Sequence, residues 1–313
     1  MVRLASIILN RPGGTAIDTD ADRGDEEVIL AAELPSNQGY VRLSSIAQDA
    51  REFLALGSLG GLDKAKALLA SPEARPGGSL HVATADCRSC PPIDGSLVRK
   101  FICIGLNYRD HCKESGMPVP EEPVVFSKFG SSIIGPGDVI VLDEGLTKKL
   151  DFEVELGIII GTKVPRHTKE SDAMKYIGGY TVVHDVSARD WQLEKNGGQW
   201  LLGKCIDGFA PIGPVIVTKD EIPDVDNLSI RCRLNGDTVQ NSMTSQMVFQ
   251  CDALVAFLSR FMTLLPGDII ATGTPPGVGL GRDPPLWLKD GDVVECEIDG
   301  IGTLSNPIVD ASK

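Results

Sequence analysis

Carboxylates alternate with apolar residues along the segment 150–156, LDFEVEL. Alternate side chains of a β-strand point to the same face, so Asp151, Glu153 and Glu155 are expected to share one face. Two carboxylates about 4 Å apart, at an effective dielectric near 20, repel each other by about 4 kcal/mol. A hard divalent cation relieves this repulsion, and an all-oxygen ligand set suits Mg²⁺, with Mn²⁺ or Ca²⁺ as alternatives. A solvated strand face would explain the same alternation without a metal.

A further acidic residue, Asp185, follows the apolar run 178–184. Carboxylates at the ends of core strands occur in active sites, but they also cap helices. Either Asp185 or Ser187 is suited to cap a helical segment at 188–194. The residues alone therefore leave both roles of Asp185 open.

His111 and Glu114 form a candidate general acid/base pair. They are three residues apart in a segment expected to turn helical, so they share one helix face. A carboxylate beside an imidazole fixes its tautomer and raises its basicity, which suits the pair to activating water. The alternative is an ordinary surface ion pair. A zinc protease site is excluded because the second histidine of that motif is absent.

Two weaker signals lie further along the chain. Lys204 follows an apolar run, and a buried lysine usually pairs with an anion. The Gly/Pro-rich stretch 271–279 exposes backbone amides that could hold a carboxylate, although it could equally well only turn the chain. It lacks the lysine and the length of a phosphate-binding P-loop.

The elements that must position these residues are mainly strands. After residue 100, short β-type runs separated by Gly and Pro dominate, and strands are expected at 101–105, 139–142, 154–160, 180–184, 215–217, 230–234, 269–272 and 293–298. One amphipathic helix is expected at 252–265. Because few helices interrupt the strands, the pattern predicts an α+β fold rather than alternating βαβ units.

The first 95 residues have a different pattern. Strands at 2–9 and 27–32 precede helical patterns at 44–56 and 62–69. A Gly/Pro-rich loop and a Cys-Pro-Pro linker at 90–92 follow. We therefore predict a smaller α/β N-terminal domain at 1–95 and a larger domain at 96–313.

Composition limits the partners and the compartment. The formal net charge is -13 and aromatic residues make up 5% of the chain, which disfavours nucleic acids and anionic membranes as partners. No apolar run is long enough to span a bilayer. The acidic residues at 18–27 argue against a mitochondrial transit peptide. We expect a cytoplasmic protein, with a mitochondrial protein whose transit peptide has been removed as the alternative.

The eight cysteines are scattered, without the density of a disulfide-rich secreted scaffold. Cys87 and Cys90 form a CxxC pair, but no second pair of ligands follows it. The sequence therefore favours reduced thiols over a structural zinc site.

From about residue 95 to the end, the chain resembles the fumarylacetoacetate hydrolase family. Six motifs in the same order carry this resemblance: GLNYRDHCKESG, FSKFGSS, LDFEVELGIIIG, GGYTVVHDVSARDWQ, QWLLGKCIDGFAPIGP and GDIIATGTPPGVG. The first 95 residues resemble the variable N-terminal domain of these proteins. The resemblance implies a mixed β-roll, barrel-like C-terminal domain and a homodimer.

The resemblance also implies roles for the candidate residues. Matching the family's ExE pair and its later aspartate makes Glu153, Glu155 and Asp185 the ligands of Mg²⁺ or Mn²⁺. Matching its HxxE pair, often on a lid that orders over the substrate, makes His111 and Glu114 catalytic. Asp151 shares the acidic face, but it matches no ligand of the family and is expected behind the ligands.

Substrate-contacting residues of the family match Arg189, Gln192, Lys204 and Thr274. The implied substrate is a small 2-oxo acid whose carboxylate and 2-oxo oxygens bind the metal. In this scheme Lys204 is also catalytic, because it neutralises and orients the substrate, together with Gln192. Arg189 is expected to support the metal carboxylates or the substrate acid.

Three reactions share the metal-stabilised enolate that this scheme implies. Hydrolysis of the C–C bond in an acylpyruvate is the main expectation from the family resemblance. The His/Glu pair favours a reaction that uses water or moves a proton, but it does not choose among the three. Keto–enol tautomerisation or decarboxylation of oxaloacetate are the alternatives. A protein of another class, which binds metal and oxo acid without turnover, is less well supported because binding alone needs no acid/base pair.

Overall fold

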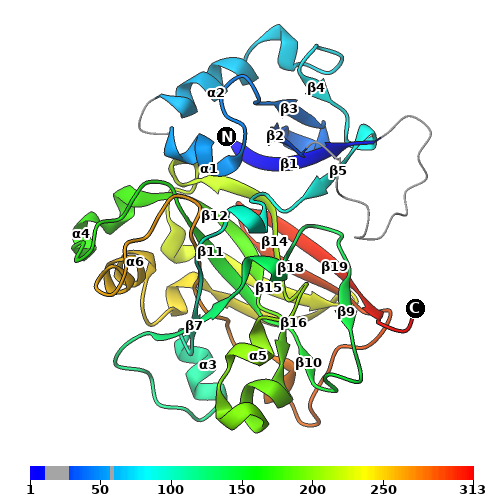
Figure 1. The fold of residues 1–313 in the computed structure, drawn as a ribbon, viewed down its shortest axis with the longest axis vertical. Helices are drawn as coiled ribbons and strands as arrows, with labels where there is room; N and C mark the ends of the chain where they lie inside the picture. The colour runs from blue at the N-terminus through cyan, green and yellow to red at the C-terminus, as the bar shows by residue number, and fades with distance from the viewer. Residues whose placement is uncertain (11–27, 57–59) are drawn as a thin grey trace.

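Residues 1–10, 28–56 and 60–313 are described by a computed structural model (Figure 1). The acidic residues at 18–27 lie outside the described residues. In Figure 1 the N-terminal segment, coloured blue to cyan, forms the upper part of the molecule, and the remaining sheets and helices lie below it. Among the described residues, no helix has the length and apolar character needed to cross a membrane.

A large mixed sheet of twelve strands forms the framework. Across it run β4 (His81–Val82), β3 (Tyr40–Arg42), β2 (Val28–Glu33), β1 (Arg3–Leu9), β14 (Ala210–Thr218), β12 (Ile177–His184), β11 (Val154–Ile160), β17 (Ile269–Ala271), β6 (Phe101–Gly105) and β7 (Val124–Lys128). In addition, β5 (Cys87–Cys90) pairs with β1, and β8 (Ile133–Ile134) pairs with β14. Because β1 also pairs with β14, the sheet continues from the N-terminal segment into the rest of the chain.

A second sheet of five strands packs against β11 and β12. Its order is β16 (Asp237–Met243), β15 (Ser229–Leu234), β18 (Val293–Ile298), β19 (Gly302–Asp310) and β9 (Ile140–Leu142). Two further short strands, β10 (Leu150–Asp151) and β13 (Ser187–Ala188), pair with each other beside these sheets. The predicted α+β class is confirmed, and in the part of the chain that is described the sheets stay open rather than closing into a barrel.

Helices are few and short. They are α1 (Ala50–Ala55), α2 (Gly61–Leu69), α3 (Arg109–Glu114), α4 (Glu170–Ala173), α5 (Leu201–Lys204) and α6 (Cys251–Ser259), with a π-helical turn at Asp190–Glu194 and single 3₁₀ turns such as Gly279–Gly281.

Two predicted helices are shorter than expected. The helix predicted at 44–56 begins only at Ala50, because the Asp49 carboxylate accepts the backbone N–H of Glu52 and caps the helix there. The helix predicted at 252–265 ends at Ser259 and continues only as a turn, in which the Phe261 and Met262 amides both donate to the Leu258 carbonyl. Apolar periodicity alone therefore does not fix where a helix begins or ends.

The predicted helix cap at Asp185 is not formed. β13 continues the chain as a strand at this point, and the Asp185 carboxylate instead accepts a hydrogen bond from the buried Lys204 ammonium group and forms an ion pair with Lys128. Of the two roles left open, the structure therefore excludes the capping role.

The core lies on both faces of β11, whose seven residues are all buried. Leu156 and Ile158 belong to the apolar cluster shared with the five-stranded sheet, including Ile230. Ile159 points to the opposite face, into a cluster that includes Phe53 of α1. A strand covered on both faces is rigid, so the residues at its ends are held in fixed positions.

Replacing Ile158 with alanine should lower the free energy of unfolding by about 2–5 kcal/mol, because it leaves a cavity in the centre of the sheet. Denaturant unfolding followed by circular dichroism measures the change. The matched control is Val125→Ala on the edge strand β7, where the side chain is 43% exposed, and the expected change there is within about 0.5 kcal/mol. Equal losses in the two variants would contradict this assignment of the core.

Candidate active site

Three buried carboxylates converge where β11 and β12 meet. Glu155 lies within β11, Glu153 immediately precedes this strand, and Asp185 immediately follows β12. The antiparallel register pairs Glu155 with Val183, which brings the start of one strand beside the end of the other. One oxygen from each carboxylate lies within 4.8 Å of the others. Within the described residues, this is the one group of Asp, Glu, His or Cys that is arranged to hold a metal ion.

Three buried cations surround these carboxylates. Lys204 Nζ lies 2.7 Å from a Glu153 oxygen and 2.8 Å from an Asp185 oxygen. Arg189 Nη2 lies 2.6 Å from the other Glu153 oxygen, and Lys128 Nζ lies 2.7 Å from the other Asp185 oxygen. Each oxygen of Glu153 and Asp185 therefore has a cationic neighbour.

Lys128 is the cation that sequence reasoning missed. Besides Asp185, its ammonium group donates to the backbone carbonyls of Val186, Lys204 and Phe209, at 3.0, 2.5 and 2.7 Å. In the sequence, Lys128 ends a short run that resembles an exposed edge strand, and a lysine in such a strand is ordinarily solvated. Its inclusion in the FSKFGSS motif was the only signal available.

These neighbours shift the pKa values of Glu153 and Glu155 in opposite directions. Burial opposes ionisation of Glu153, but Arg189 and Lys204 outweigh it and lower the pKa of Glu153 to about 2. For Glu155 the balance is reversed, since burial together with the charges of Asp185 and Glu153 raises its pKa well above the usual value. The backbone N–H of Gly273 donates to Glu155 at 2.8 Å, but among the described residues no cation forms an ion pair with this carboxylate.

The donor set fits a hard divalent cation. All three candidate ligands offer carboxylate oxygens, the ligand type that Mg²⁺, Mn²⁺ and Ca²⁺ prefer. The raised pKa of Glu155 also indicates that the cluster lacks a positive charge on the Glu155 side. The buried acidic triad is therefore suited to hold a metal ion.

Arg189 and Gln192 are held together beside this cluster. Arg189 follows β13, and its Nη1 donates to Gln192 Oε1 at 2.9 Å. Gln192 lies in the π-helical turn Asp190–Glu194. Since its carbonyl oxygen is engaged by Arg189, Gln192 offers mainly its amide N–H groups to a ligand.

Thr274 lines the same site, but its hydroxyl is already engaged. It donates to the Val154 carbonyl at 2.9 Å and accepts a hydrogen bond from Gln240 Nε2 at 2.9 Å. Gln240, in β16, also accepts the backbone N–H of Val154 through Oε1 at 3.0 Å. Gln240 thus ties β11 to the loop that carries Thr274, and nothing in the sequence had identified it.

His111 and Glu114 lie on α3 at another side of the site. His111 Nδ1 and Glu114 Oε2 are 3.0 Å apart. The backbone N–H of Gly277 donates to both oxygens of Glu114, at 2.9 and 3.1 Å. When Nδ1 donates to Glu114, the other ring nitrogen, Nε2, is left as a proton acceptor.

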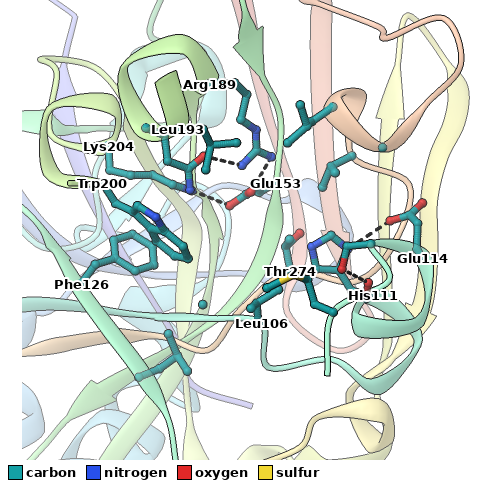
Figure 2. Close-up of a pocket in the computed structure, with 18 of the residues that line it drawn as sticks. Leu106, His111, Glu114, Phe126, Glu153, Arg189, Leu193, Trp200, Lys204 and Thr274 are labelled. Carbon is teal, nitrogen blue, oxygen red and sulfur yellow. Dashed lines mark hydrogen bonds and ion pairs between the residues drawn. The ribbon is translucent and has the colours of Figure 1, made fainter. Parts of the chain in front are cut away.

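Most of the predicted site residues line one cavity of about 440 Å³ (Figure 2). In Figure 2, Lys204 and Arg189 converge on Glu153, and Phe126 and Trp200 lie beside Lys204. Of the residues predicted for the site, the cavity is lined by His111, Glu114, Glu153, Glu155, Arg189, Gln192, Lys204 and Thr274. Asp185 lies behind this lining, in contact with Lys204.

One wall of the cavity is apolar. Phe126 and Trp200 pack edge to face, with ring centroids 5.4 Å apart, and Lys204 Nζ lies 5.1 Å from the centre of the Phe126 ring. Leu106, Leu193 and further apolar side chains extend this wall. A low-dielectric wall strengthens the interactions between charged groups and a ligand inside the cavity.

Comparison with known proteins identifies the family of this chain. The family described as fumarylacetoacetate (FAA) hydrolase C-terminal matches residues 100–309. A Xenopus laevis protein named oxaloacetate tautomerase fahd2, mitochondrial, is 54% identical over 260 residues, which cover 83% of this chain and 78% of the relative. The human protein named oxaloacetate tautomerase FAHD2A, mitochondrial, is 55% identical over 210 residues, which cover 67% of this chain and 66% of the relative.

A solved structure shares the whole architecture. It is the 5-carboxymethyl-2-hydroxymuconate delta-isomerase from Mycobacterium smegmatis, which is 33% identical, with a TM-score of 0.72 over 99% of this chain and all of that one. The family match covers more than half of the chain, and it includes every residue predicted for the site. This chain is therefore an enzyme of the fumarylacetoacetate hydrolase family.

Proposed function

We propose that this enzyme interconverts the keto and enol forms of oxaloacetate, with a divalent metal, most simply Mg²⁺, bound by Glu153, Glu155 and Asp185. The observation that carries the proposal is the convergence of the three buried carboxylates on a cavity that the His111–Glu114 pair also lines. The names of the Xenopus and human relatives support oxaloacetate as the substrate.

Tautomerisation of oxaloacetate thereby takes the place of acylpyruvate hydrolysis as the leading reaction. Acylpyruvate hydrolysis was the main expectation from the sequence, and tautomerisation of oxaloacetate was an alternative. Two relatives more than 50% identical carry the tautomerase name, and the solved relative is named as an isomerase. All three names describe reactions that move hydrogen without adding water.

Tautomerisation transfers one proton and leaves the atom count unchanged. C3 of the keto form loses a proton, the C2–C3 bond becomes double, and the C2 oxygen gains a proton. A bound divalent cation would supply Lewis-acid stabilisation of negative charge on the C2 oxygen. His111 Nε2 is the proposed group that takes the proton from C3, because Nδ1 is oriented by Glu114.

The cations at the site would hold the substrate in position. Oxaloacetate is a dianion, and both Arg189 and Lys204 line the cavity. The Gln192 amide N–H groups add donors for a carboxylate. Together these groups would keep C3 within reach of His111 and away from bulk water.

Hydrolysis of an acylpyruvate remains the second candidate, supported by one observation. A cavity of about 440 Å³ lies in the range that accommodates drug-sized ligands, and it exceeds what a four-carbon acid needs. The same His111–Glu114 pair is suited to activating water. Decarboxylation of oxaloacetate would use the same enolate, and release of pyruvate and CO₂ would identify it.

The proposed enzyme is a mitochondrial homodimer. The resemblance to the family implies a homodimer, and exposed apolar side chains such as Phe129 and Leu202 are suited to an interface. Both named relatives are described as mitochondrial, so a mitochondrial location replaces the cytoplasmic one expected from the sequence. Analytical ultracentrifugation should give a single species of twice the chain mass of 33.4 kDa, and a monomer at micromolar concentration would contradict the dimer.

The substrate can be tested directly with purified enzyme and Mg²⁺. Enol and keto oxaloacetate, acetylpyruvate and fumarylpyruvate are supplied separately. Enol loss is followed by ultraviolet absorbance and pyruvate by a coupled assay. We expect interconversion of the oxaloacetate forms without pyruvate release. Faster pyruvate release from an acylpyruvate than interconversion of oxaloacetate would support hydrolysis instead.

Glu155→Gln should abolish metal binding, because it keeps the shape of the side chain but removes one of the three candidate carboxylate ligands. Mg²⁺ at about 100 times its Kd should stabilise the wild type by about 2.7 kcal/mol, and the variant should show no such stabilisation in thermal unfolding. Isothermal titration calorimetry gives the Kd, with Glu297→Gln on the five-stranded sheet as the control. Unchanged Mg²⁺ affinity in Glu155→Gln would remove Glu155 from the ligand set.

His111→Asn should lower kcat by about 10²- to 10⁴-fold, the usual contribution of a general acid or base. The Kd for Mg²⁺ should not change, because no carboxylate ligand contacts the ring. Steady-state kinetics and calorimetry on the same preparation separate the two effects. Parallel loss of metal binding and turnover would contradict the proposed role of His111.

A further inference from the structure

Asp151 is a fully buried carboxylate that lies beside the acidic cluster without belonging to the candidate ligand set. Its Oδ1 accepts the backbone N–H groups of Phe152 and Gly279, at 2.8 and 2.7 Å. Its Oδ2 accepts Arg189 Nε at 2.8 Å and the backbone N–H of Leu280 at 3.0 Å. Each of the two oxygens already accepts two hydrogen bonds from protein donors. Asp151 therefore has little capacity left to bind a metal or a substrate.

Two of the four donors belong to the turn 277–281, which forms part of the cavity wall. This turn is held by carboxylates at two points. Asp151 binds the amides of Gly279 and Leu280, while Glu114 accepts the amide of Gly277 with both of its oxygens. The turn therefore lies between the acidic cluster and the acid/base pair.

The glycines of this turn permit the close contacts. Gly277 has a φ of +103°, a conformation that L side chains rarely adopt. A Cβ on Gly279 would lie 2.6 Å from Asp151 Oδ1, and a Cβ on Gly281 would lie 3.3–3.5 Å from the carboxyl atoms of Glu114. The backbone of the turn thus lies so close to both carboxylates that a side chain at Gly279 or Gly281 would crowd them.

We propose that Asp151 is a positioning residue that sets the geometry of the His111–Glu114 pair through the turn 277–281. Asp151 holds the Gly279 and Leu280 amides and thereby fixes the position of the turn, including the Gly277 amide. The Gly277 amide in turn orients Glu114 against His111 Nδ1. Through Arg189, the same carboxylate is also linked to Glu153. The acid/base pair and the metal end of the cavity are therefore placed relative to each other by one buried side chain. The kinetic part of this inference rests on the proposed tautomerase activity.

Asp151→Asn is the direct test, because the amide replaces one acceptor oxygen with a donor and breaks hydrogen bonds on that side. We expect kcat to fall by about 100-fold, the scale of a displacement of about 1 Å in a catalytic group. The Mg²⁺ affinity should change much less, since all three ligands remain. The variant is made alone and in combination with Glu114→Gln.

The double variant separates action through Glu114 from general damage. If Asp151 acts through the turn, Asp151→Asn should cost at least tenfold less in kcat when Glu114 is already Gln. Equal fold losses in both backgrounds would mean that the two residues act independently, and that would overturn the proposal. Any loss that persists in the Glu114→Gln background measures the second route, through Arg189.

Asp268→Asn is the matched control. Asp268 is also a fully buried aspartate, and it accepts the Lys100 ammonium group at 2.6 Å and the backbone N–H groups of Lys100 and Leu265. It lies just before β17 and does not line the cavity. Its effect on kcat should be the same in both Glu114 backgrounds.

Hydrogen–deuterium exchange tests the same link without any turnover. Asp151→Asn should speed exchange in peptides that cover 277–281 and 109–114, whereas Asp268→Asn should leave both unchanged. Unaltered exchange in 109–114 would overturn the proposal. A wild type with no tautomerase activity would overturn the proposed function, but the exchange result would still stand. If Asp151→Asn does not fold, Asp151→Glu replaces it, because it keeps the charge but moves the carboxylate away from the Gly279 and Leu280 amides; exchange in 277–281 and 109–114 must then rise, or the proposal fails.

Discussion

The structure depends on a balance of buried charges at the junction of β11 and β12. Four carboxylates, those of Asp151, Glu153, Glu155 and Asp185, lie in the interior with three cations, those of Lys128, Arg189 and Lys204. An isolated charge in such surroundings is very unfavourable, and a buried pair is tolerated only when its geometry and hydrogen bonds are nearly complete. Three carboxylates meet this condition through ion pairs. Among the described residues, Glu155 has no such ion pair, and this is the side on which the buried acidic triad is suited to hold a cation.

The sheets supply the rigidity that this balance requires. β11 is covered on both faces, so neither Glu153 nor Glu155 can relieve repulsion by moving with its backbone toward solvent. Loops complete the site from further away. The 273–281 segment contributes amides to Glu155, Glu114 and Asp151 in turn, so one short stretch of backbone contacts both the acidic cluster and the His111–Glu114 pair.

The sequence predicted the features that depend on local periodicity. The alternation in LDFEVEL placed Glu153 and Glu155 together, and the spacing of three placed His111 beside Glu114. Asp185 could not be placed by local pattern, because its position depends on pairing between two strands; the family resemblance identified it. The α+β class also followed from the scarcity of helical patterns among the β-type runs.

Residues that act across long separations were not predictable in this way. Lys128 donates to carbonyls 58, 76 and 81 residues away, and Gln240 reaches Val154 across 86 residues. Nothing in the neighbouring sequence distinguishes either side chain from a solvated polar residue. The helix bounds were misplaced because the apolar periodicity extends beyond the helices themselves, which begin at the Asp49 cap in one case and end at Ser259 in the other.

Because Glu155 pairs with Val183, the geometry of the site depends on the register between β11 and β12. Side chains alternate along a strand, so a slip of one residue between β11 and β12 would turn Glu155, the carboxylate within β11, toward the opposite face. A chain with that register would keep its strands but would separate Glu155 from Asp185. The acidic cluster therefore exists only when these two strands pair in the register that the structure shows.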